Sequence, residues 1–495
     1  MAQPSFDERT QSFLNWFTAL PGATFHPSIQ IQDLRQSGQG RGIVATSDIP
    51  EETELFKIPR AAIINTLTSD LTKKIPQVFE DSTEGLENNE ADEEGETSGA
   101  PDSWVSLILV MIYEFMQGDQ SKWKPYFDIM PESFDTLMFW PRTDLGGLQA
   151  SAISAKIGKD EADNMFRAKI LPVIEEHAQI FYPEGSKRMN EEELLSLAHR
   201  MGSTVMAYAF DLENDDEEPE EEGDEWVEDK EGKLMMGMVP MADVLNADVV
   251  FNAHVNHEDD FLTVTSLKPI SAGQQVLNYY GPLSNSELLR RYGYVTSNHA
   301  RYDVVELSWN MVLSSHLKLD ESTWGQAMGW IMDRNALTNA YRSISSTRKE
   351  TEDTFVIDRD LDEPDSRGDV HGEVKLQQLP ADLEEQIATF LKAVRKVSPE
   401  SIPDKRKRDE ISAGVIHQAL QLRLSEYPTS EAEDQALLQD PNFTDRQKMA
   451  IVVRLGEKKL LGEAIQVAAE KINAMTRNGD DASSEPSAKR HKSSR

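Results

Sequence analysis

The spacing of hydrophobic positions in the first half of the chain predicts one helix, two short strands and then a block of helices. From Ser5 to Leu20 the apolar residues recur at helical spacing, and Ser5 with Glu8 fits a capping box. Strands are predicted over Gly42–Ala45 and Glu54–Ile58, on either side of an Asp-Ile-Pro turn. Further helices are predicted over Trp104–Gln117, Glu161–His177 and Glu191–Ala209.

The hydrophobic pattern changes twice in the second half. Between Met238 and Val295 apolar positions alternate around a Pro-Ile-Ser-Ala-Gly turn, which predicts short strands joined by tight connections. Helical spacing then returns, and its apolar stripes are typical of packing faces between helices. Thr444 and Gln447 fit a second capping box. The predicted helices cover Ser322–Ser343, Ala381–Val397, Glu410–Glu426 and Thr444–Met475.

Composition narrows the class of protein. The 495 residues are long enough for two or three domains, and the absence of cysteine excludes disulfides and thiolate metal sites. We expect no metal. The longest apolar run, Val105 to Met116, is too short to span a bilayer, so we expect a soluble protein with no membrane partner.

The formal net charge of −37 is concentrated in three acidic stretches, Glu80–Glu96, Asp211–Glu231 and Glu352–Asp369. Such stretches repel themselves and carry little to bury, so they are interpreted first as solvated insertions. The alternative is that they attract a basic partner, such as a ribosomal protein or a histone tail. Because phosphate repels this charge, we expect no direct binding of nucleic acid.

Two short basic runs stand out in so acidic a chain. One is Lys405-Arg406-Lys407-Arg408, and the other lies in the polar, Ser-rich tail that begins at Arg477 and contains Lys489, Arg490 and Lys492. Runs of this kind are found in nuclear-import signals but also occur by chance. We expect the protein in the nucleus, with the cytoplasm as a second location.

Four motifs carry candidate chemistry. Tyr280 and Tyr292 each precede a glycine, and Tyr280 lies about thirty residues after the Asp-Val-Leu-Asn turn that ends at Asn246. A glycine-rich turn, Gly38-Gln39-Gly40-Arg41-Gly42, precedes the first predicted strand, where glycine lets the backbone approach a ligand closely. The fourth motif is Trp-Lys-Pro-Tyr, from Trp123 to Tyr126.

Together these motifs resemble the SET-domain protein lysine methyltransferases. The Trp-x-Pro-Tyr signature resembles their Rubisco-methyltransferase-like branch, and the sequence around Asn246 and Ala247 resembles its fungal ribosomal lysine N-methyltransferase group. The resemblance implies an α+β SET-domain fold of short β-strands interrupted by a helical insert, followed by an all-α C-terminal substrate-binding domain. It also implies S-adenosylmethionine as the cofactor.

The resemblance implies a role for each motif. Tyr280 and Tyr292 match the catalytic tyrosines. The predicted cofactor-binding residues are Gln39, Gly40, Arg41, Asn246, Ala247 and Tyr292, where Ala247 replaces the histidine of many relatives. The predicted substrate-binding residues are Trp123, Tyr208, Asp243 and Tyr280. For Trp123 the alternative of a packing anchor in the helical insert stays open.

The implied activity is monomethylation of a lysine in a large-subunit (60S) ribosomal protein by a monomeric enzyme. A histone or transcription-factor target, or a catalytically silent acidic binding module, stays open as an alternative. The predicted segments are 1–79 (first part of the SET domain), 80–100 (acidic linker), 101–210 (helical insert), 211–231 (acidic insertion), 232–296 (catalytic part), 297–475 (substrate-binding domain) and 476–495 (basic tail).

Overall fold

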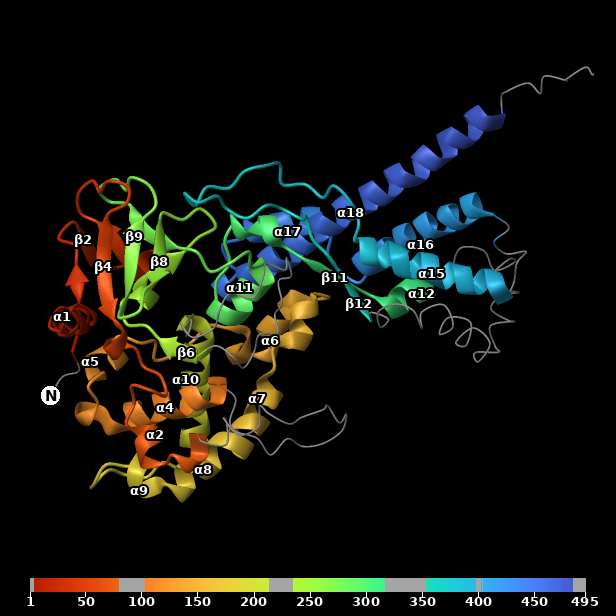
Figure 1. Ribbon diagram of the computed structural model, residues 1–495. Coiled ribbons are helices and arrows are strands. Elements are labelled where there is room, and N and C mark those ends of the chain that lie inside the picture. Colours follow the sequence, from red (N-terminus) through yellow and green to blue (C-terminus); the bar gives the residue numbers. More distant parts are fainter. Residues whose placement is uncertain are drawn as a thin grey trace, which may run out of the picture.

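The computed structural model describes residues 4–79, 103–212, 235–316, 353–397, 402 and 404–483. The predicted helix at 322–343, the basic end of the tail and most of the first two acidic stretches lie outside these residues. In Figure 1 the strands lie above the helical insert, and the C-terminal helices extend away from both. The predicted order of short strands, a helical insert and C-terminal helices is present in the described residues.

The N-terminal segment supplies two helices and four strands to the catalytic half. Ser5 caps α1 through a capping box with Glu8, as predicted. Strands β3 and β4 match the predicted strands to within a residue. The elements are α1 (Phe6–Thr18), β1 (Thr24–Phe25), β2 (Ile29–Asp33), β3 (Arg41–Ala45), β4 (Glu54–Pro59) and α2 (Leu71–Lys74).

The helical insert forms around a largely apolar helix, α4, whose residues from Val105 to Glu114 are all buried. The predicted helix over Glu161–His177 is split by a π-helical turn, Phe166–Ile170, into α7 and α8. The helices are α4 (Ser103–Gln117), α5 (Lys124–Phe127), α6 (Arg142–Leu145), α7 (Lys159–Met165), α8 (Leu171–Glu176), α9 (Ala178–Phe181) and α10 (Glu191–Tyr208).

Strands from the two ends of the catalytic half pair in two four-stranded sheets, with orders β1-β4-β9-β8 and β2-β3-β10-β7. Strand β10 pairs antiparallel with β3 and parallel with β7, so the predicted glycine turn and Asn246 lie side by side. The later elements are β5 (Ala209–Leu212), β6 (Met235–Met238), β7 (Asn246–Ala247), β8 (Ala253–His257), β9 (Phe261–Ser266), β10 (Gln275–Asn278) and α11 (Asn285–Tyr292).

The C-terminal domain is helical but also holds a two-stranded antiparallel ribbon, β11–β12, that the hydrophobic pattern did not predict. The long helix α18 packs against α16 and α17 and also against α11 and α6, so it joins this domain to the catalytic half. The elements are β11 (Val305–Ser308), α12 (Trp309–His316), β12 (Thr354–Ile357), α15 (Ala381–Val397), α16 (Lys405–Ser425), α17 (Glu431–Leu438) and α18 (Asp445–Ser483).

The ends of two C-terminal helices follow from capping. Thr444 and Gln447 exchange hydrogen bonds at the start of α18, as the predicted capping box requires. Helix α16 begins five residues before the predicted Glu410, because Asp404 caps it by accepting from the Lys407 amide. The basic run Lys405–Arg408 therefore forms the first turn of a helix.

Candidate active site

A cavity of about 470 Å³ lies where the glycine turn, the Asp-Val-Leu-Asn turn and the helical insert meet. Seven residues with a predicted role line it: Gln39, Gly40, Arg41, Tyr208, Asp243, Asn246 and Tyr280. They come from segments that lie far apart in the sequence and that the sheet pairing brings together. No cluster of three or more His, Asp or Glu side chains suited to a metal ion occurs in the described part of the chain.

The glycine turn bends the backbone around one end of this cavity. Gly38 and Gly40 have φ angles of 79° and 62°, in the left-handed region that glycine tolerates best. At Gly42 an added Cβ would lie 2.5 Å from Leu34 Cδ1 and 2.7 Å from Asn246 Nδ2. Glycine at position 42 therefore lets Asn246 approach the first strand directly.

Asn246 links the two halves of the catalytic segment. Its side-chain amide donates to the Arg41 carbonyl oxygen at 3.2 Å and to Gln275 Oε1 at 3.0 Å. These two bonds fix the orientation of the amide group. The side chain also lines the cavity, so its oxygen is held there as an acceptor.

Arg41 places a cation at the same end of the cavity. Its guanidinium lies 3.8 Å from the centre of the Phe6 ring and donates to Thr10 Oγ1 and to the Ile129 carbonyl oxygen. Burial, with repulsion from the neighbouring arginines, lowers its pKa to about 10. Within the described residues no carboxylate pairs with Arg41, so an anionic group bound in the cavity would gain a partner.

Tyr280, which lines the cavity, forms a stacked pair with Tyr292. Their ring centres are 5.0 Å apart and the ring planes differ by 21°. The Tyr280 hydroxyl donates to the Leu245 carbonyl oxygen at 2.8 Å, and burial raises its pKa well above its ordinary value. The hydroxyl therefore keeps its proton, and its oxygen presents lone pairs to a group entering the cavity.

Asp243 is an acidic side chain that lines the same cavity as Tyr280. One carboxyl oxygen accepts a hydrogen bond from the Tyr126 hydroxyl, while the other, Oδ1, is enclosed without a hydrogen-bond partner among the described residues. Burial raises the pKa of Asp243 to about 7. Tyr208, one of the cavity residues, has its pKa raised to about 12, first by burial and then by the charge of Asp243.

The prediction that Trp123 faces the substrate is corrected. The Trp123 side chain is 1% exposed and its indole N–H donates to the Ala62 carbonyl oxygen at 2.7 Å, which is the packing-anchor alternative. Tyr126, three residues later in the same motif, lines the cavity instead. The proline between them lies in the first turn of the short helix α5, and Tyr126, although itself fully buried, donates its hydroxyl to Asp243 of the site.

Two residues with predicted cofactor-binding roles stand outside the cavity walls. Ala247 pairs with Asn278 in the β7–β10 ladder, and the Tyr292 ring stacks on the Tyr280 ring. Their roles stay predictions. Conversely, Phe6 and Arg35 line the cavity although no motif singled them out. The hydrophobic pattern of the first helix makes Phe6 look like an ordinary core residue. The Arg35 guanidinium lies 3.9 Å from the centre of the Phe6 ring.

Comparison with known proteins agrees with this geometry. The family description "SET domain" matches residues 40–281, and "Rubisco LSMT substrate-binding" matches residues 339–461. The chain is thus similar to SET-domain proteins over residues 40–281. More particularly, a region similar to the Rubisco LSMT substrate-binding domain follows at residues 339–461.

Named relatives are similar over different lengths. Ribosomal lysine N-methyltransferase 4 of Saccharomyces cerevisiae is 33% identical over 61% of this chain and 58% of its own length. N-lysine methyltransferase SETD6 of Homo sapiens is 24% identical over 90% of this chain and 88% of its own. The matches to the yeast protein and to setd6 of Xenopus laevis span a little over half of those relatives, 58% and 56%.

Solved structures share the fold along nearly the whole chain. A structure of the SET domain of LSMT bound to lysine and AdoHcy superimposes with a TM-score of 0.62 at 18% identity, covering 96% of this chain and 94% of that one. Rubisco LSMT bound to AdoMet gives a TM-score of 0.61 at 18% identity, with 97% of each chain covered. At this identity the likeness concerns the fold.

Proposed function

We propose that this protein is an S-adenosylmethionine-dependent protein-lysine N-methyltransferase. The observation that carries the proposal is one cavity that brings two sets of groups together. The first set is the glycine turn, Asn246 and Arg41, and the second is Tyr280 with Asp243. A methyl transfer needs this arrangement, because holding donor and acceptor in line is the main catalytic contribution.

The glycine turn, Asn246 and Arg41 fit S-adenosylmethionine by their chemistry. The bent backbone of the glycine turn and the fixed amide of Asn246 offer hydrogen-bonding groups, and Arg41 offers a cation for a carboxylate. The bound cofactor would supply a methyl group on a positively charged sulfur. The relatives' structures with AdoMet and AdoHcy support this assignment.

Tyr280 and Asp243 fit a lysine side chain. Because the Tyr280 hydroxyl donates to Leu245, its lone pairs can accept an N–H from the amine and orient the nitrogen. The Tyr292 ring, outside the cavity, stacks on Tyr280 and supports it. Asp243, one of the cavity residues, would attract an incoming ammonium, and the positive charge of a nearby sulfonium would favour loss of a proton from that ammonium.

For the substrate we propose a lysine of a large-subunit ribosomal protein, monomethylated by a monomeric enzyme in the nucleus. The name of the yeast relative supports the ribosomal target. The net charge of −37 supports a basic partner. The exposed basic turn at Lys405–Lys407 supports nuclear import.

The test is methyl transfer from labelled S-adenosylmethionine by the purified protein. Separate reactions contain large-subunit ribosomal proteins and histones, and labelled lysines are mapped by mass spectrometry. Label on one ribosomal lysine supports the proposal. Label only on histones would replace the substrate, and cofactor binding without label on either would favour a silent binding module.

A further inference from the structure

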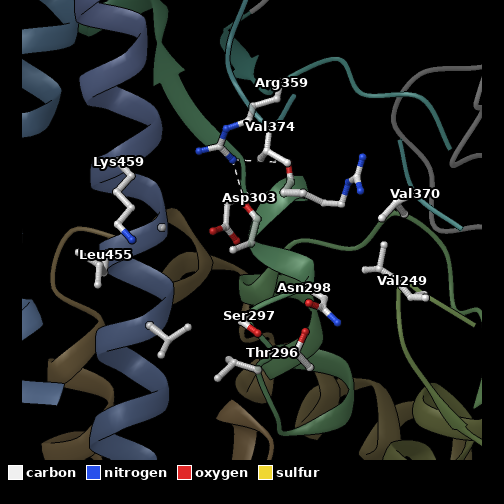
Figure 2. Close-up of a pocket in the computed structure, with 16 residues that line it drawn as sticks. Val249, Thr296, Ser297, Asn298, Asp303, Arg359, Val370, Val374, Leu455 and Lys459 are labelled. Carbon is white, nitrogen blue, oxygen red and sulfur yellow. Dashed lines mark hydrogen bonds between the residues drawn. The ribbon is translucent and has the colours of Figure 1, made fainter. Parts of the chain in front are cut away.

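Another cavity, of about 630 Å³, borders α18 and is drawn in Figure 2. It shares no lining residue with the candidate active site. Its buried carboxyl group, Asp303, lies beside α18 at Gly456, where an added Cβ would overlap the carboxyl oxygen. A cofactor in the candidate active site would gain nothing from this second cavity, so its hold depends on the groups around the first.

Three side-chain amides beside the candidate active site form one hydrogen-bonded network, the amide network of Asn246, Gln275 and Gln39. Asn246 Nδ2 donates to Gln275 Oε1 at 3.0 Å, and Gln275 Nε2 donates to Gln39 Oε1 at 2.7 Å. Asn246 and Gln39 line the cavity, whereas Gln275 is not among the lining residues. Gln275 therefore connects two predicted cofactor-binding residues that lie far apart in the sequence.

A backbone carbonyl group sets the direction of the amide network. The Arg41 carbonyl oxygen can only accept, and Asn246 Nδ2 donates to it at 3.2 Å. The same NH2 group also faces Gln275, so Gln275 turns its oxygen toward Asn246 and its NH2 group toward Gln39. The orientation of each amide therefore follows from the hydrogen bonds of the one before it.

The two ends of the amide network offer opposite groups to the cavity. Asn246 keeps its oxygen as an acceptor, and Gln39, whose oxygen accepts from Gln275, keeps its NH2 group as a donor. If either amide turned over, donor and acceptor would exchange places. A polar group of a bound molecule would then lose its partner, which weakens binding.

The fold fixes Gln275 more firmly than it fixes Gln39. Gln275 lies in β10 opposite Val44 of β3, and its carbonyl oxygen accepts from Asn252 Nδ2 at 2.8 Å. An added Cβ at Gly42 would lie 3.0 Å from Gln275 Oε1, so glycine leaves the space that this amide occupies. Gln39 is exposed in the glycine turn, so its hydrogen bond to Gln275 is what orients it.

We propose that Gln275 is a positioning residue of the cofactor site. It acts through its neighbours: it holds the Gln39 amide with the donor available to the cavity, and the Asn246 amide with the acceptor there. The inference rests on the proposed function, since the bound molecule is S-adenosylmethionine. It adds a residue that none of the four sequence motifs contains.

The test measures binding of S-adenosylhomocysteine, which lacks the transferable methyl group, by calorimetry. Gln275→Met keeps the length of the side chain but removes the amide, and it should raise Kd about tenfold. In methyl transfer the variant should raise KM for S-adenosylmethionine by a similar factor, with kcat within about twofold of wild type. The thermal unfolding midpoint of each variant establishes that it is folded.

Gln274→Met is the matched control for Gln275→Met. Gln274 is the preceding residue, is exposed, and lies outside the cavity lining. Its Oε1 accepts from the Ser271 amide at 2.9 Å, within the turn before β10. Its replacement should therefore leave the Kd for S-adenosylhomocysteine unchanged. If it weakens binding as much as Gln275→Met does, the loss reflects damage to β10 and the proposal is overturned.

A double variant separates positioning from packing. Gln39→Ala should raise Kd about fivefold in the wild-type background. In the Gln275→Met background it should raise Kd by less than about twofold, because Gln39 has already lost its orientation there. Equal costs in the two backgrounds would mean that the residues act independently, which contradicts the proposal.

The proposed function and the role of Gln275 fail in different ways. If wild type binds no S-adenosylhomocysteine, dependence on S-adenosylmethionine fails, and the role of Gln275 with it. If wild type binds it and Gln275→Met binds it as tightly, only the role of Gln275 is refuted.

Discussion

Replacing Asp243 with Asn should stabilise the protein at alkaline pH while reducing its activity. Burial raises the pKa of this carboxyl from 3.8 to about 7, so the charged form is disfavoured in the folded state. A shift of about three units corresponds to about 4 kcal/mol at full strength. Because the side chain borders a cavity open to water, we expect about 2 kcal/mol.

The sign and the pH window follow from linkage. Between pH 3.8 and about pH 7 the folded protein keeps a proton that the unfolded chain releases, so stability falls as pH rises through this range. Above about pH 7 the carboxylate is charged in both states, and the full loss of folding stability caused by its burial persists. The gain of Asp243→Asn should therefore be about twice as large at pH 8 as at pH 5.5.

Thermal unfolding at these two pH values measures the effect. For a domain of this size, about 2 kcal/mol at pH 8 corresponds to a rise of about 4–8 °C in the unfolding midpoint. Tyr126→Phe is the opposite control, since it removes the donor to the carboxyl and should lower the midpoint at pH 8. An unchanged or lowered midpoint for Asp243→Asn at pH 8 would refute the assignment of a penalised carboxylate.

The same variant tests the role of Asp243 toward the substrate. If the carboxylate receives the lysine ammonium, kcat/KM of wild type should rise through about pH 7 as Asp243 ionises. Asp243→Asn should lack this rise and lose about tenfold at pH 8. A wild-type pH profile retained by the variant would assign the rise to another group.

Three further predictions concern the site and its surroundings. Tyr280→Phe should lower kcat about 100-fold with cofactor Kd unchanged, because it removes only the hydroxyl at the reacting end, whereas Tyr279→Phe should leave methyl transfer intact. Gly42→Ala should weaken cofactor binding in calorimetry about tenfold, since its Cβ would displace the asparagine of the site; Gly146→Ala, with open space around it, should not. Replacing residues 213–234 with a short Gly-Ser linker should raise KM for the basic substrate at low salt but not at high salt, and a salt-independent KM would leave them as solvated insertions.

The last of these predictions depends on where the second acidic stretch begins. Asp211 was assigned to that stretch from its composition, but the structure places it in β5, opposite Met236 of β6. A deletion beginning at Asp211 would remove two residues of this ribbon. Charge content alone does not reveal that a strand precedes the run.

Local signals in the sequence predicted the elements and much of the site. Capping boxes at Ser5 and Thr444 correctly marked two helix starts, because each depends on residues three apart. Tyr280 and Asn246, which the motifs singled out, both line the cavity, and their roles stay predictions. The motif containing Trp123 pointed to the right segment but to the wrong aromatic residue, since which ring faces the core depends on how α5 packs.

Features that depend on distant contacts could not be predicted from the sequence. Phe6 lies in an apolar stripe like any core residue, and only the fold places it between Arg35 and Arg41. The β11–β12 ribbon pairs segments separated by more than forty residues. Asp303 carries no local signal at all, because its enclosure results from α18 passing at Gly456.

The central claim is methyl transfer to a lysine held beside Tyr280 in the cavity. The most direct measurement compares wild type and Tyr280→Phe with labelled S-adenosylmethionine and large-subunit ribosomal proteins from cells that lack this enzyme. We expect wild type to label one lysine and the variant to label it about 100-fold more slowly with unchanged cofactor binding. Full activity of the variant, or no label with wild type on any protein, would contradict the account.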